Sequence, residues 1–145
     1  MEATTLINLA QLAIAQEQLE HAGQLLAEAN TIAAAQSYWD SLAWAAQAAG
    51  DLEFLQPEPS MAQLVNQYLA ACAYAAHFND HTLEQQFQAV RERWQAHAED
   101  GYGDQACAFC AIALAAWAQV DDDVAKTKVQ HFLEQLQAEL GCHNQ

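Results

Sequence analysis

Apolar side chains recur along this chain every three or four residues, which is the spacing of a helix with one buried face. The first such stretch places Leu6, Leu9, Ala10 and Ala13 on one side. The pattern returns after each polar or Gly-containing interruption, and no stretch alternates strictly between apolar and polar positions as a half-buried strand does. Seven helices are expected, over about residues 5–15, 19–36, 38–50, 60–79, 82–99, 105–119 and 124–140.

Turn and cap residues set the expected ends of the first helices. Residues 16–18 form a tight turn between the first two helices, and Ser37 is expected to cap the third. Gly50, followed by Asp51, is expected to end that helix in the left-handed conformation. Both prolines fall in 51–60, which makes this segment the clearest break in the pattern.

The later helices also have candidate ends. Ser60 and Thr82 are expected to begin the fourth and fifth helices. Asp104 is the expected cap of the helix over 105–119, which is apolar nearly all round and is therefore predicted to be central and buried. The acidic run 121–123 suits the N-terminus of the last helix, where carboxylates complement the helix dipole, and Gly141 follows its end.

Composition agrees with an all-α protein. The chain has 145 residues, of which 53% are hydrophobic and 16% charged, with only 5 Gly and 2 Pro. This length predicts a single helical domain over 1–145 with a possible break at 51–60, and it is enough to bury one core.

The charge of the chain indicates which kinds of partner it attracts and which it repels. Four Lys and Arg residues stand against 19 Asp and Glu, giving a formal net charge of -15. Such a chain repels phosphate backbones, so nucleic acid is not an expected partner. Every Lys and Arg follows residue 90, so the preceding part is purely anionic. The negative electrostatic field of this part favours a basic protein or peptide as partner. A role of the acidic residues in solubility alone would also explain the charge.

Several features favour a cytoplasmic protein that binds no membrane. Glu2 stands where a secretory signal would carry a basic residue, and no apolar run is long enough to span a bilayer. The four cysteines, in a chain with sufficient core of its own, are expected to be thiols and not a disulfide framework. They are Cys72, Cys107, Cys110 and Cys142.

The first helical hairpin resembles the tetratricopeptide repeat. The positions that match its pattern of large and small residues are Leu6, Leu9, Ala10, Ala13, Leu19, Ala22, Leu26 and Ala29. A second start at Trp39, Leu42, Ala43 and Ala46 lies 33 residues after the first, comparing positions 6 and 39, where the repeat has about 34. A third match is formed by Phe109, Ile112, Ala113, Ala116, Ala125, Val129 and Phe132. The resemblance implies stacked helical hairpins with a concave protein-binding groove and no catalysis; a plain irregular helical bundle is the alternative fold.

Two patterns of Cys and His residues are candidates for chemistry. Cys107 and Cys110 form a C-x-x-C, read here as core packing, with a redox pair or a zinc site that adds His131 or His143 as the alternatives. His77 and His81 are four apart, but the Asn79-Asp80 turn is expected to break the helix between them. No catalytic constellation, resident metal or cofactor is therefore predicted.

Aromatic residues supply the candidate binding site. Trp39 and Trp44 are five apart and cannot share one narrow helical stripe, so one of the two is expected to face a groove, and Trp44 or Tyr38 is the expected anchor for a ligand. The candidate binding residues are Tyr38, Trp39, Trp44, Asp40 and Asp51. The predicted function is a non-catalytic adaptor or scaffold that binds a peptide or helix of a partner protein. The alternative is an acidic inhibitor, of the immunity-protein type, that blocks a basic surface; the Ala- and Gln-rich helices are also compatible with a homodimer.

Overall fold

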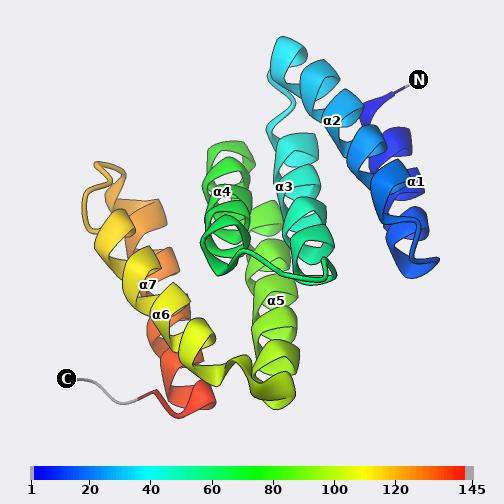
Figure 1. The fold of residues 1–145 in the computed structure, drawn as a ribbon. Helices are drawn as coiled ribbons and strands as arrows, with labels where there is room; N and C mark the ends of the chain where they lie inside the picture. The colour runs from blue at the N-terminus through cyan, green and yellow to red at the C-terminus, as the bar shows by residue number, and fades with distance from the viewer. Residues whose placement is uncertain (1, 143–145) are drawn as a thin grey trace. The chain divides into compact units, whose positions relative to one another are not determined.

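The computed structural model describes residues 2–142, and these contain helices and turns but no strand (Figure 1). The helices are α1 (Ala3–Ala15), α2 (Leu19–Gln36), α3 (Trp39–Phe54), α4 (Met61–Phe78), α5 (Asp80–His97), the π-helical turn η1 (Ala98–Tyr102), α6 (Gly103–Trp117) and α7 (Asp123–Leu140). The all-α class is thus confirmed. The prediction of seven separate helices is confirmed only approximately. Helices α5, η1 and α6 follow one another without a connecting loop, and the chain kinks at Gly101, where φ is 101°.

The chain divides into two compact units, residues 1–86 and 87–145. The boundary falls inside α5, so its first residues belong to the first unit and the remainder to the second. The proline segment in 51–60, the predicted possible break, lies within the first unit, which contains both α3 and α4.

In the first unit α1 and α2 form a helical hairpin, and α3 packs against both of them. The predicted turn between α1 and α2 is confirmed, with Glu17 in the left-handed region at φ 60°. Alanines at the contacts, such as Ala10 and Ala29, are fully buried and allow the helices to approach closely. The core cluster here is Leu6, Ile7, Ala10, Leu26, Ala29, Ala45 and Ala48.

Helix α3 differs from its prediction at both ends. Ser37 does not cap it: Ser37 ends α2 in the left-handed conformation, with φ 54°, and Tyr38 occupies the N-cap position of α3. Gly50 does not end it either, because α3 continues to Phe54 and buries Gly50. A Cβ atom at position 50 would lie 2.6 Å from Cε1 of Tyr68 on α4. The glycine is therefore needed for the close approach of α3 and α4, and not for a turn.

Side-chain hydrogen bonds cap the N-termini of α4 and α5. Ser60 Oγ accepts from the backbone N–H of Gln63 at 3.3 Å, which confirms the predicted cap of α4. Asn79 Oδ1 accepts from the N–H of Thr82 at 2.8 Å. Helix α5 therefore begins at Asp80, two residues before the predicted start, because the Asn side chain provides the capping acceptor.

In the second unit α6 packs against α7. Asp122 Oδ1 accepts from the N–H groups of Val124 and Ala125, both at 3.1 Å, so the acidic run does begin the last helix, and Gly141 ends it with φ 71°. Helix α6 starts at Gly103 without a cap from Asp104, and it is not buried all round, since Ile112 is 50% exposed. One face packs inward and the other, rich in alanine, is exposed; alanine tolerates both environments, so composition did not reveal the difference.

Candidate functional site

The structure has an open depression of about 670 Å³ where the start of α1, the end of α2 and the start of α3 meet. Tyr38, in the short connection between α2 and α3, lines this depression and is 49% exposed. The other lining residues are Glu2, Ala3, Thr4, Ile32, Gln36, Asp40 and Ser41. An exposed aromatic ring, an aliphatic side chain and two carboxylates thus line one surface of the first unit.

Of the five predicted binding residues, only Tyr38 and Asp40 line this depression. Trp39 instead stacks on the imidazole of His77, with ring centroids 4.6 Å apart and planes at 16°, and lies near Tyr74 at 6.1 Å. These contacts connect the start of α3 to the end of α4.

Trp44 and Asp51 also have packing roles. Trp44 is partly buried against the core cluster of the first unit. Asp51 Oδ1 accepts a hydrogen bond from the hydroxyl of Tyr68 at 2.8 Å, and Tyr68 is fully buried. The contact lies one residue after Gly50, where a Cβ atom would be 2.6 Å from Cε1 of the Tyr68 ring.

The depression lies in a unit whose formal charge is negative. Residues 1–86 contain ten Asp and Glu and no Lys or Arg. The carboxylates of Glu2 and Asp40 therefore have no Lys or Arg of their own unit to neutralise them. A cationic side chain brought by a ligand would be attracted here, more strongly at low salt than at high salt.

Sequence reasoning missed Glu2, Thr4, Ile32 and Gln36 as lining residues. They come from two helices whose ends meet only after the α1–α2 hairpin has closed and α3 has packed on it. Each reads locally as an ordinary helix-end or surface residue. A search for polar residues near both ends of a predicted hairpin would have been the available signal.

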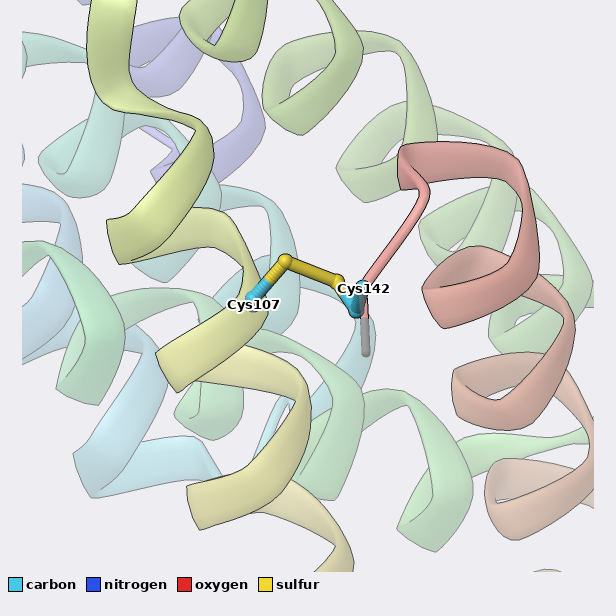
Figure 2. The surroundings of a disulfide bond; sticks show 2 residues. All are labelled: Cys107 and Cys142. Carbon is cyan, nitrogen blue, oxygen red and sulfur yellow. A yellow bond between two sulfur atoms is a disulfide. The ribbon is translucent and has the colours of Figure 1, made fainter. Parts of the chain in front are cut away.

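The cysteines differ from their prediction. Cys107 and Cys142 form a disulfide, with their Cα atoms 5.6 Å apart, although they are separated by 35 positions in the chain (Figure 2). The expectation of four thiols was wrong because packing of α6 against α7 brings the two residues together, which length and composition do not reveal. Cys72 and Cys110 are the free cysteines, and both are buried.

The disulfide also changes the interpretation of the C-x-x-C. Cys107 is bonded to Cys142 and is not paired with Cys110, whose side chain is fully buried, as core packing predicts. Among residues 2–142 no group of three or more His, Cys, Asp or Glu is placed to hold a metal ion, and His131 is exposed. His143, the other considered ligand, lies outside the described residues.

Burial of Cys72 predicts a loss of stability at alkaline pH. Desolvation raises the pKa of this thiol from 9.0 to about 12. Above pH 9 the unfolded chain releases this proton while the folded chain retains it, so stability falls with rising pH until about pH 12. Between pH 8 and pH 10 the free energy of unfolding should decrease by ~1.4 kcal/mol more in the wild type than in Cys72→Ala. Denaturant unfolding at both pH values measures this, and an equal decrease in the two proteins would contradict it.

The hydrogen bond between Tyr68 and Asp51 should contribute measurably to stability. Tyr68→Phe removes the hydroxyl that donates to Asp51 and leaves the ring in place, so we expect a loss of about 1 kcal/mol in the free energy of unfolding. Tyr74→Phe, on the same helix, is the control, because phenylalanine keeps the ring contact with Trp39. Equal effects of the two substitutions in denaturant unfolding would show that the hydrogen bond contributes nothing specific.

The chain matches no protein-family model, and no curated protein or solved structure is found to be similar to it. None of the helices between residues 2 and 142 combines the length and the apolar character that crossing a bilayer requires. The site must therefore be interpreted from its own geometry and charge.

Proposed function

We propose that this chain is a non-catalytic protein-binding module, an adaptor or scaffold that binds a peptide or helix of a partner protein at the depression beside Tyr38. One observation carries the proposal. A half-exposed tyrosine lies with the carboxylates of Glu2 and Asp40 around one depression, in a unit that has no Lys or Arg.

In peptide binding, apolar contacts supply most of the affinity, and charged side chains select the charge of the ligand. A tyrosine ring offers a large apolar contact area at low entropic cost, and such rings dominate the energy of many interfaces. Ile32 extends the apolar contact, while carboxylates select the charge of the ligand and increase its rate of association. The partner segment is therefore expected to combine an apolar side chain with Lys or Arg.

The arrangement of the helices supports a repeat-like scaffold as part of this proposal. Helices α1 and α2 form one hairpin, and α3 and α4 pack together as the next pair, with α3 against both helices of the first. Stacking of this kind produces extended binding surfaces in helical-repeat proteins. The depression lies where the first pair meets the second.

The charge favours a second candidate function. Ten acidic residues and no Lys or Arg in 1–86 also suit an inhibitor that covers the basic surface of another protein. Binding of that kind would be spread over many carboxylates and would not depend on Tyr38. The same experiment separates the two functions.

The test uses peptides selected from a random display library on the full chain and then titrated by fluorescence anisotropy. For an adaptor, Tyr38→Ala should weaken binding at least ~10-fold. Asp40→Asn should weaken it at about 0.1 M salt and have less effect at about 1 M, where the Debye length is only about 3 Å. Glu28→Gln is the matched control, since Glu28 is exposed on α2 but does not line the depression.

Three outcomes are informative. Selected peptides that are basic and depend on Tyr38 support the adaptor. Binding that is lost at high salt but is equally weakened by Asp40→Asn and Glu28→Gln, and unaffected by Tyr38→Ala, supports the acidic inhibitor. Selection of no peptide at about 0.1 M salt contradicts both functions, because each requires attraction of a basic ligand.

A further inference from the structure

The disulfide connects the beginning of α6 to the end of α7, the two helices that pack together in the second unit. Cys107 lies in the second turn of α6, and Cys142 follows Gly141 at the end of α7 (Figure 2). The covalent loop between them contains most of α6, the connection and all of α7. Both cysteines are only partly buried, whereas Cys72 and Cys110 are buried.

We propose that the bond between Cys107 and Cys142 is a reversible redox clasp, which a cellular thiol opens to release the end of α7 from α6. A low-molecular-weight thiol or a dithiol protein is the co-reactant. The inference concerns the second unit and does not depend on the proposed binding at Tyr38.

The exchange proceeds in two balanced steps. A thiolate of the reductant attacks one protein sulfur, the bond between the two cysteines breaks, and the released cysteine takes up a proton. A second thiol then attacks the mixed disulfide, which frees the other cysteine as a thiol. The protein gains two electrons and two protons, and the two reductant thiols become one disulfide. An oxidised disulfide of the same class closes the clasp by the reverse route.

The other two cysteines do not compete for this bond. Cys110 is one helical turn after Cys107 and is the nearest thiol along the chain, but it is fully buried in the core. Burial raises its pKa to about 12, and that of Cys72 likewise, so almost no thiolate exists at neutral pH. Because the thiolate is the attacking species, internal reshuffling is suppressed and opening requires an external thiol.

Opening should change the stability of α6 and α7. The disulfide restricts the unfolded chain by closing a loop across 35 positions. For a loop of this length, the loss of unfolded-state entropy should raise the equilibrium constant for folding by roughly a few hundred-fold, and reduction of the bond removes this gain. Contacts between α6 and α7 remain after reduction, so the expected response is increased local opening and not the loss of all structure.

The experiment begins with thiol counting on the full chain. After mild oxidation and denaturation the protein should show two free thiols, Cys72 and Cys110, and four after reduction. The native protein is then equilibrated in glutathione buffers of graded reduced-to-oxidised ratio. The clasp should pass from closed to open within this series. Four thiols after oxidation, or a bond that stays closed in every buffer, would overturn the proposal.

Hydrogen exchange then locates the effect. Reduction should accelerate exchange in peptides from 103–142 by at least ~10-fold and leave those from 3–78 unchanged. Cys142→Ala should reproduce the reduced pattern under oxidising conditions, while Cys72→Ala should keep the full redox response. Equal exchange of the closed and opened wild-type protein would overturn the proposal even if Cys142→Ala failed to fold.

Discussion

Gly50→Ala should lower the free energy of unfolding of the first unit by about 2–3 kcal/mol. The added Cβ would lie 2.6 Å from Cε1 and 2.8 Å from Cδ1 of the Tyr68 ring. The ring is fully buried, and its hydroxyl bonds to Asp51, so it cannot move aside without losing that bond. Helices α3 and α4 must separate instead, and this cost exceeds the gain in helix propensity of up to about 1 kcal/mol. The loss is measured by denaturant unfolding followed by Trp fluorescence, together with hydrogen exchange of residues 39–78.

Gly23→Ala is the matched control. Gly23 lies within α2, and a Cβ there would meet Leu52 Cδ2 at 3.7 Å, an ordinary contact distance. The same substitution should therefore stabilise the protein, by about 0.5–1 kcal/mol. Opposite signs for the two variants are the result that supports the close approach of α3 and α4; a stabilising Gly50→Ala would refute it.

Phe132→Ala should destabilise the second unit by about 4 kcal/mol. Phe132 on α7 is 3% exposed and stacks on Phe87, with ring centroids 4.3 Å apart and planes at 10°. The guanidinium of Arg91 lies 5.4 Å from the centroid of the Phe132 ring and also pairs with Glu139 at 3.1 Å. Truncation removes the stack and the cation–π contact and leaves a cavity between α5 and α7.

Val124→Ala on the same helix provides the reference for Phe132→Ala. Val124 is 65% exposed, so its truncation should change stability by less than about 0.5 kcal/mol. Hydrogen exchange of 87–142 is the appropriate measurement, because the chain has two compact units that need not unfold together. A loss for Phe132→Ala no greater than for Val124→Ala would show that the stack contributes little.

The sequence predicted best the features that depend on neighbouring residues. The apolar period gave the positions of the helices, because a helix must place its buried residues on one face. Ser60, the 121–123 run and Gly141 were identified as helix ends because a cap bonds within three or four residues of itself. Errors at this level arose where two local signals competed, as at Asn79 and Thr82, since both residue types can cap.

Gly50 shows where local reasoning fails. Glycine followed by a polar residue is common at helix ends, and nothing near it in the sequence shows that the Tyr68 ring, 18 positions later, covers it. Of the five predicted binding residues, only Tyr38 and Asp40 line the depression, for a similar reason. Trp39 and Asp51 contact residues of α4, whereas Trp44 packs against a core cluster of α1, α2 and α3, and all of these partners are set by helix packing.

The sequence by itself determined that this protein is all-helical, strongly acidic and without a Lys or Arg before position 91, because periodicity, caps and charge are properties of short stretches. Only the tertiary structure decided that Gly50 admits the Tyr68 ring, that Tyr38 and Asp40 share a depression with Glu2, and that Cys107 bonds to Cys142. Each of these joins residues from different helices. Their distances depend on how the helices pack, and packing is determined by the fit of whole helical faces and not by any single segment.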